Sequence, residues 1–181
     1  MGKWIVALLE FSLQYLSQKS VKGQVVADFL ADHPCAEEDL KIDQVDLCAA
    51  YLTPWLLTFD GSSTDEKGGA GIVIESPLNS LVEFSFQLDF DCTNNQAEYE
   101  ALIIGLNILV DMGVKTVKLV GDSQLVIKQL TGEFRCNSSS LLQYYELALK
   151  LLNNFDEVVL EHVPRELNHQ ANYLAQLASG L

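Results

Sequence analysis

The chain of 181 residues is 49% hydrophobic and 20% charged, a globular composition that excludes a disordered protein. Its length suits one domain with an extension better than two full domains. The net charge is −14, and residues 1–54 and 55–181 are both acidic, which excludes capture of nucleic acid by a broad basic surface. A polyanion must therefore be held locally, and divalent cations bound by carboxylates are one way to do so.

The N-terminal part of the sequence predicts no export signal. An apolar run opens the chain, but Glu10 interrupts it and no small-residue cleavage site follows, which argues against a signal peptide. We expect a monomer inside the cell, cytoplasmic or nuclear, that is neither secreted nor bound to a membrane. Residues 33–54 contain two prolines and an acidic cluster without a sustained period, so they are typical of a linker. The four cysteines are widely spaced, which favours free thiols over a zinc site or a disulfide framework.

Three strands are predicted at the start of the main domain. Residues 55–63, 69–76 and 80–90 are rich in β-branched and aromatic side chains, and turn-forming residues separate them. Three such strands in succession favour an antiparallel arrangement.

Helices and strands alternate in the rest of the chain. Thr93 and Gln96 form a capping-box signature before apolar residues at helical spacing, and Gly113 ends that helix. The remaining predicted elements are a strand over 115–122, helices over 123–132 and 139–155, a strand over 157–164 and a helix from 168. This order predicts an α/β fold with a mixed sheet, in which three antiparallel strands are followed by parallel strands joined through helices.

Three acidic residues stand where this fold would bring them together. Asp60 follows an apolar strand, Glu98 lies one turn into the first helix, and Asp122 ends the fourth strand. Each also has an ordinary explanation, as a turn residue, an exposed residue near a helix start, and an N-cap respectively. Their conjunction favours a common site, because strands one and four are neighbours in such a sheet and ligands gather at the carboxyl ends of parallel strands.

A divalent metal site would explain the cluster. Carboxylates this close repel one another unless a cation neutralises them, and Mg²⁺ or Mn²⁺ takes oxygen ligands of this kind. Two ions about 3.5–4 Å apart can activate a water and stabilise the leaving oxygen of a phosphodiester. The chemistry that fits best is therefore phosphodiester hydrolysis, with two ions expected.

Five motifs over roughly residues 55–179 resemble the type 1 ribonuclease H family in their order and spacing. They are TFDGSS, AGIVI, TNNQAEYEALIIGL, GDSQLVIKQLTGEF and EHVPRELNHQANYLAQLAS. The nearest resemblance is to the RNase H domain of gypsy-type retroelement polyproteins and their plant relatives. It implies the RNase H-like fold, with a five-stranded sheet, and metal-dependent cleavage of the RNA strand of RNA–DNA hybrids. It also implies that Asp60, Glu98 and Asp122 match the first three metal-binding carboxylates of the family.

The resemblance further implies contacts with the substrate. Asn94 and Asn95 match a polar pair that contacts the RNA minor groove, where the 2′-hydroxyl distinguishes RNA from DNA, although both could simply cap the helix. Arg165 could meet a phosphate or be a solvated loop cation, and Gly61 could allow close approach of the substrate or serve a turn. The predicted substrate-binding residues are Gly61, Ser62, Asn94, Asn95, Ser123 and Arg165.

Two features depart from the family. Asn172 stands where the family has its fourth carboxylate, so it offers a neutral oxygen that can reach a metal but cannot act as a general base. His162 and His169 are poor replacements, because one belongs to a predicted strand and the other to a loop. A basic hybrid-binding protrusion is missing, since residues 133–140 contain only Arg135 as a cation. We therefore expect weak hybrid binding and reduced activity.

The N-terminal piece resembles the end of a second such domain. Residues 13–34 are similar in sequence to residues 160–178, with ADFLA aligned to ANYLA. They also resemble the end of the RNase H-like segment that precedes an RNase H domain in some gypsy-type polyproteins. We therefore divide the chain into an upstream remnant over 1–32, a linker over 33–54 and an RNase H domain over 55–181. A reverse transcriptase domain of the parent polyprotein would then be a partner.

One function is expected, and one alternative stays open. The expected function is a retroelement-derived, metal-dependent endonuclease that hydrolyses the RNA of RNA–DNA hybrids. Its catalytic and metal-binding residues would be Asp60, Glu98, Asp122 and Asn172. The alternative is a catalytically weakened or inactive nucleic-acid-binding or connecting module with the same fold.

Overall fold

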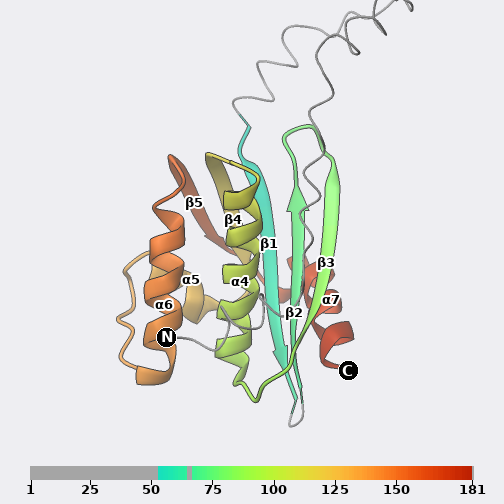
Figure 1. Cartoon of the computed structure of the whole chain (residues 1–181), viewed down its shortest axis with the longest axis vertical. Coiled ribbons are helices and arrows are strands. Elements are labelled where there is room, and N and C mark those ends of the chain that lie inside the picture. Colours follow the sequence, from blue (N-terminus) through green and yellow to red (C-terminus); the bar gives the residue numbers. More distant parts are fainter. Residues whose placement is uncertain (1–52, 65–66, 181) are drawn as a thin grey trace, which may run out of the picture. The chain divides into compact units, whose positions relative to one another are not determined.

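The computed structural model describes residues 53–64 and 67–180, which form a sheet with helices on both faces (Figure 1). The predicted upstream remnant over 1–32 lies outside the described residues. The predicted linker over 33–54 lies outside them as well, except for its last two residues. No helix in the part of the chain that is described is long and apolar enough to cross a membrane.

The sheet has five strands in the order β3-β2-β1-β4-β5. β1 (Trp55–Ser63) pairs antiparallel with β2 (Gly68–Glu75), and β2 pairs antiparallel with β3 (Leu81–Leu88). β1 also runs parallel to β4 (Thr116–Gly121), and β4 runs parallel to β5 (Glu157–His162). The predicted RNase H-like sheet, with three antiparallel strands followed by parallel ones, is therefore confirmed.

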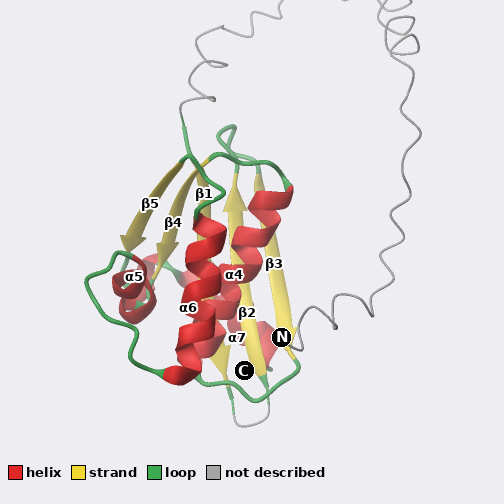
Figure 2. Ribbon diagram, turned by 60° about the vertical axis from the view of Figure 1, so that its left-hand side comes forward, coloured by secondary structure: helices red, strands yellow, loops and turns green. Residues whose placement is uncertain are grey.

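Helices cover both faces of this sheet. Those described are α4 (Asn94–Asp111), α5 (Gln124–Leu130), α6 (Ser139–Leu152) and α7 (His169–Ser179), with a 3₁₀ turn, η1 (Arg165–Leu167), before α7. The helices α4 and α6 pack against each other over one face, and α7 crosses the other (Figures 1 and 2). The predicted helices are thus confirmed, whereas η1 lies in a segment for which only a loop was predicted.

Successive residues of β1 show the two faces of the sheet. A Cβ atom on Gly61 would overlap the backbone of α4, whereas the hydroxyl of Ser62 lies 3.1 Å from the hydroxyl of Ser179 in α7. Because successive side chains of a strand point to opposite faces, β1 is clamped between these two helices. The main apolar core lies on the α4 side and includes Leu57 and Phe59, both fully buried.

The start of α4 is fixed by the predicted capping box. The backbone N–H of Thr93 donates to the Gln96 side chain at 2.8 Å, and the Thr93 hydroxyl accepts from the Gln96 N–H at 3.4 Å. These reciprocal bonds satisfy N–H groups that a helix start would otherwise leave unpaired. The helix therefore begins at a defined residue, which fixes the position of Glu98 in its second turn.

The helix α7 lies directly on glycines of β2. A Cβ atom on Gly69 would overlap the backbone oxygen of Ala175, and one on Gly71 would overlap that of Ala171. Because neither glycine has a side chain, the helix backbone approaches the strand closely. Any shift of α7 along β2 would lose this fit, so the position of its first turn is set by the sheet.

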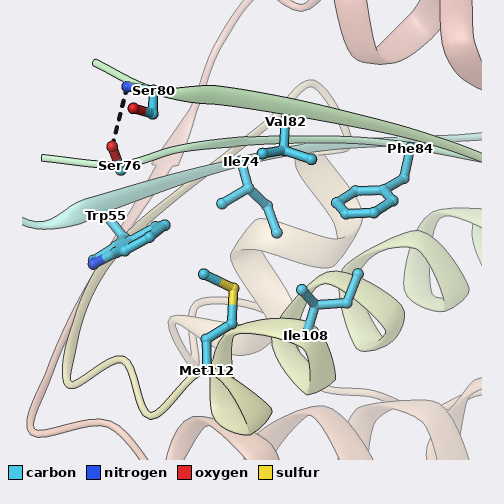
Figure 3. A pocket seen from close by; sticks show the side chains of 8 residues that line it. All are labelled: Trp55, Ile74, Ser76, Ser80, Val82, Phe84, Ile108 and Met112. Carbon is cyan, nitrogen blue, oxygen red and sulfur yellow. Dashed lines mark hydrogen bonds between the residues drawn. The ribbon is translucent and has the colours of Figure 1, made fainter. Parts of the chain in front are cut away.

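An apolar cavity of about 250 Å³ lies between α4 and the first three strands (Figure 3). Its walls include Trp55 at the start of β1, Val82 and Phe84 on β3, and Ile108 and Met112 near the end of α4. None of the predicted site residues lines this cavity. It is therefore separate from the candidate site, which lies toward the other end of β1.

Candidate metal centre

The three predicted carboxylates meet at one place. One oxygen each from Asp60, Glu98 and Asp122 can be chosen so that all three lie within 4.8 Å of one another. They come from β1, from α4 and from the residue that follows β4, and the first two are buried while Asp122 is half-buried. The sequence-based expectation that these residues cluster is confirmed.

The ordinary explanations of these three residues are wrong. Asp60 is not in a turn, because β1 continues to Ser63 and Asp60 pairs with Gly71 of β2. Glu98 is only 5% exposed, so it is not a solvated residue near a helix start. Asp122 is not the N-cap of α5, since Ser123 occupies that position and accepts from the Val126 N–H.

Burial and mutual repulsion hold the carboxylates in an electrostatically costly state. Burial, together with the charge of Asp122, raises the pKa of Asp60 to about 8. Burial, followed by the charges of Asp60 and Asp122, raises the pKa of Glu98 to about 9. The N–H of Gly61 and the charge of Arg165 act in the opposite direction on both groups, but more weakly. A bound cation would reverse this balance, because it stabilises the ionised forms.

The donor set fits a divalent metal. The Oε2 atom of Glu98 is buried and has no hydrogen-bond partner among the described residues. Buried carboxylate oxygens are normally hydrogen-bonded, so such an atom needs an explanation. A hard cation at the cluster would supply both the missing partner and the missing charge.

Gly61 allows the helix to reach the strand. A Cβ atom at this position would overlap the backbone of Ala97 and Glu98. The turn predicted as one explanation of Gly61 is wrong, because Gly61 lies within β1 and pairs with Ala70. Its missing side chain lets α4 approach β1, and this contact brings Glu98 to the level of Asp60.

The predicted substrate-binding residues differ in exposure. Asn94 and Asn95 are exposed at the start of α4, and their interpretation as caps is wrong because Thr93 is the N-cap. Arg165 is exposed in η1, whereas Ser62 is only 8% exposed and lies against α7. The structure thus places three of these polar side chains where a polyanion could reach them.

Asn172 is engaged by protein donors. Its Oδ1 accepts from the Arg165 guanidinium at 2.6 Å and from the Gln176 side chain at 3.2 Å. Arg165 in turn lies close enough to Asp60 and Glu98 to lower the pKa of both. A positive side chain therefore connects Asn172 to the carboxylate cluster.

Asn168 is a residue of this site that the sequence did not reveal. It is 1% exposed, and its Nδ2 donates to the Phe59 carbonyl at 3.0 Å and to the Asp122 carboxylate at 2.8 Å. The only sequence signal was an asparagine at the start of a predicted helix, which an N-cap explains equally well. Its place beside the cluster follows from the fold.

His162 and His169, the two histidines in the described part of the chain, make no recorded contact with the carboxylate groups. A ring nitrogen of His162 lies 3.1 Å from the backbone carbonyl of Asp122, at the end of β5. His169 is exposed as the first residue of α7, so its assignment to a loop is wrong. The expectation that His162 lies in a strand is confirmed.

Two curated proteins are similar to this chain in sequence. The chain is 41% identical over 122 residues to ribonuclease HI of Halobacterium salinarum, and the alignment covers 66% of this chain and 61% of that protein. It is 34% identical over 119 residues to the bifunctional protein Rv2228c of Mycobacterium tuberculosis, covering 64% and 33%. The chain thus spans less than two thirds of the length of these relatives.

Solved structures share the fold. RNase H1 from Halobacterium salinarum matches with a TM-score of 0.65 and 39% identity, over 70% of this chain and 97% of that chain. LC11-RNase H1 in complex with an RNA/DNA hybrid matches with a TM-score of 0.64 and 28% identity, over 70% and 96%. The prototype foamy virus protease-reverse transcriptase, at 18% identity and a TM-score of 0.57, over 70% of this chain and 21% of that chain, shares the fold alone.

A family assignment follows from these similarities. The sequence profile described as reverse transcriptase-like matches residues 58–178, which is most of the described sheet and helices. The archaeal ribonuclease H adds a relative that is aligned over nearly its whole solved chain. This chain therefore belongs to the reverse transcriptase-like family and to the type 1 ribonucleases H.

Proposed function

We propose that this protein is a metal-dependent endonuclease that hydrolyses the RNA strand of RNA–DNA hybrids. The observation that carries the proposal is the convergence of Asp60, Glu98 and Asp122 where the parallel pairing of β1 with β4 ends. Similarity to ribonuclease HI of Halobacterium salinarum supports the reaction class. Similarity to LC11-RNase H1, which was solved in complex with an RNA/DNA hybrid, supports the substrate.

The three carboxylates would hold the ions, which we propose to be Mg²⁺ or Mn²⁺. When bound, two such ions would activate a water and stabilise the leaving oxygen of the phosphodiester. The protein's own contribution is to keep the ligands in a partly dry site, where charges interact more strongly than in water. The raised pKa values of Asp60 and Glu98 are consistent with ligands that ionise fully only when a cation is present.

The exposed polar residues would hold the hybrid. Asn94 and Asn95 lie at the start of the helix that carries Glu98, so they can contact the 2′-hydroxyls of an RNA strand placed at the cluster. Arg165 would meet a phosphate of that strand. Three further residues were predicted to bind substrate. Gly61 lies against α4, Ser62 contacts α7, and Ser123 caps α5. These contacts support a role in positioning the site more than direct contact with substrate.

One observation favours the alternative, a catalytically weakened or inactive hybrid-binding module. The amide oxygen of Asn172 already accepts two hydrogen bonds, from Arg165 and Gln176. It would have to give one up before ligating a metal, and it brings no charge of its own. A site with three charged ligands in place of four is therefore expected to bind its second ion weakly.

Cleavage assays separate the two functions. A hybrid labelled on its RNA strand is incubated with Mg²⁺ or Mn²⁺ and with the parent protein, Asp60→Asn, Asn172→Asp, or Glu146→Gln as a control that removes an exposed carboxylate from α6. We expect the parent to cleave, Asp60→Asn to be inactive, and Asn172→Asp to cleave at least about tenfold faster, as for an added metal-site interaction. Glu146→Gln should match the parent.

Two outcomes would redirect the proposal. If only Asn172→Asp cleaves, the natural chain is a binding module whose catalysis was lost at one position. If cleavage by the parent survives Asp60→Asn, the assignment of the metal ligands is wrong. Single-stranded RNA and an RNA duplex are tested beside the hybrid. They show whether the protein recognises a duplex that carries 2′-hydroxyls on only one strand.

The origin of the domain is a separate question. A retroelement origin, with a reverse transcriptase domain as partner, rests on the motif resemblance alone. The relatives described above are archaeal and bacterial proteins, and the foamy virus similarity extends only to the fold. We therefore restrict the proposal to hybrid cleavage.

A further inference from the structure

We infer that Asn168 is a positioning residue of the metal centre, whose carboxamide orients Asp122 and fastens the start of α7 to β1. The inference rests on the proposed function, because it concerns the same carboxylates. Asn168 Nδ2 donates to Asp122 Oδ1 at 2.8 Å and to the carbonyl of Phe59, the residue before Asp60, at 3.0 Å. One amide group thus touches Asp122 itself and the backbone beside Asp60.

The orientation of this amide is fixed by its partners. Both contacted atoms are acceptors, so only the NH₂ side of the carboxamide can lie between them. The Oδ1 atom on the other side is buried and has no hydrogen-bond partner in the described ranges 53–64 and 67–180. An unpaired buried acceptor costs about 1–3 kcal/mol. The two hydrogen bonds made by the NH₂ group offset this cost, so the amide is retained here for its contacts with Asp122 and Phe59.

The side chain also forgoes its usual role. Asn168 is the N-cap of α7, where an asparagine normally accepts a hydrogen bond from an N–H of the first turn, but its side chain makes no such bond. Its backbone carbonyl still accepts from the Asn172 N–H at 3.0 Å and so begins the helix. The helix start is thus left uncapped while the side chain is directed to Asp122.

This arrangement has a direct effect on the carboxylate. Asp122 is half-buried and follows the end of β4, so a hydrogen bond to its side chain limits the orientations that the carboxylate can adopt. A hydrogen bond to one of its oxygens leaves the second oxygen to ligate a metal. Hydrogen-bond partners of this kind typically change metal affinity about 10–100-fold when they are removed.

The test is metal binding without substrate. Asn168→Leu keeps the approximate size and branching of the side chain but removes both donors. We expect its affinity for Mn²⁺, measured by titration calorimetry, to fall at least about tenfold. The Mn²⁺ affinity of Asn168→Ser, which keeps one short donor, should fall less. Thermal unfolding in EDTA shows that each variant is folded before metal is added.

A matched control and a double variant separate positioning from helix docking. Ser85 on β3 donates to the carbonyl of Leu174 in α7 at 2.8 Å, so Ser85→Ala loosens the same helix without touching Asp122. We expect it to lower the melting temperature but to change Mn²⁺ affinity less than twofold. In an Asp122→Asn background, Asn168→Leu should cause little further loss, because both changes act through one carboxylate.

Each other outcome counts against the inference. A folded Asn168→Leu variant with the parent's Mn²⁺ affinity would overturn it and leave the proposed function standing. Equal losses in Asn168→Leu and Ser85→Ala would overturn it in favour of simple helix docking. A parent protein that binds no Mn²⁺ would overturn both the inference and the metal-dependent function.

Discussion

Phe59 of β1 lies opposite Gly121 of β4 in the last pair of the parallel ladder, so the residues that follow them, Asp60 and Asp122, lie at the same level of the sheet. A Cβ atom on Gly121 would overlap the ring of Phe59. The glycine therefore lets a large aromatic side chain fill the core directly beneath two carboxylates. Phe59 and Gly121 therefore contribute both to the packing of the core and to the positions of the two carboxylates that follow them.

The cluster should destabilise the metal-free protein. Asp60→Asn removes one of three repelling carboxylates, so we expect it to raise the free energy of unfolding in EDTA by at least about 1 kcal/mol. The same variant should lose the stabilisation that Mg²⁺ or Mn²⁺ gives the parent. Urea denaturation with and without metal measures both effects. Glu146→Gln, at an exposed position, should show neither, and a less stable Asp60→Asn variant would contradict the repulsion argument.

The stability of the metal-free protein should fall as pH rises. The pKa values of Asp60 and Glu98 are raised to about 8 and about 9 in the folded state, against about 4 in an unfolded chain. The native state therefore holds more protons than the unfolded state between about pH 4 and 9, and its free energy of unfolding decreases across that range. Urea denaturation at several pH values in EDTA checks this decrease.

Other groups titrate in the same range, so a reference variant is needed. Subtracting the pH profile of an Asp60→Asn, Glu98→Gln double variant isolates the contribution of the two carboxylates. Saturating Mg²⁺ should flatten the remaining slope, because the cation favours the ionised forms. A difference profile that stays level or rises with pH would contradict the raised pKa values.

Gly61 should tolerate no side chain. Gly61→Ala places a methyl group against the backbone of α4, which cannot move without disturbing the core, so we expect a loss of about 3 kcal/mol or more in stability. Metal affinity should fall as well, because Glu98 moves with the helix. Ser63→Ala, two residues along the same strand, is the control for substitution in β1 and should remain close to the parent in both measurements.

Hybrid binding should be weak and should depend on one arginine. Residues 55–181 contain seven basic side chains, and among them Lys118 pairs with Glu161 and Lys128 with Glu133. We expect binding to be poor above physiological salt. Fluorescence anisotropy at several salt concentrations should show that Arg165→Ala lowers the affinity for the hybrid. The slope of the logarithm of the binding constant against the logarithm of the salt concentration should decrease in magnitude by about 1.

Arg135 supplies the comparison for that measurement. It is exposed in the loop before α6, and it is not among the predicted substrate-binding residues. Arg135→Ala should change hybrid binding less than Arg165→Ala. Equal effects of the two variants would mean that Arg165 acts only through net charge, and tight binding of the parent at high salt would contradict local recognition.

Much of the fold could be predicted because local signals agreed with the tertiary structure. The apolar and β-branched runs became the strands, and the capping box at Thr93 set the start of α4. The carboxylate cluster could be predicted as well, since strand order alone places Asp60 beside Asp122. These features depend on sequence periodicity and on topology, both of which a single sequence contains.

The rest of the site depends on contacts between distant segments. Asn168 bonds to residues 109 and 46 positions away, so its direction could not be inferred from an asparagine at a helix start. Asp60 and Gly61 suggested a turn, but β1 continues through both residues because they pair with β2. In both cases tertiary packing decided between two local preferences of similar strength.

The close fit of α7 on Gly69 and Gly71 bears on how this site can change over time. Because the glycines of β2 hold the helix backbone, position 172 is held in place whatever side chain it carries. Asparagine and aspartate codons differ by a single base. A single base change can therefore remove or restore a fourth carboxylate. The backbone at position 172 would already be in place to present it.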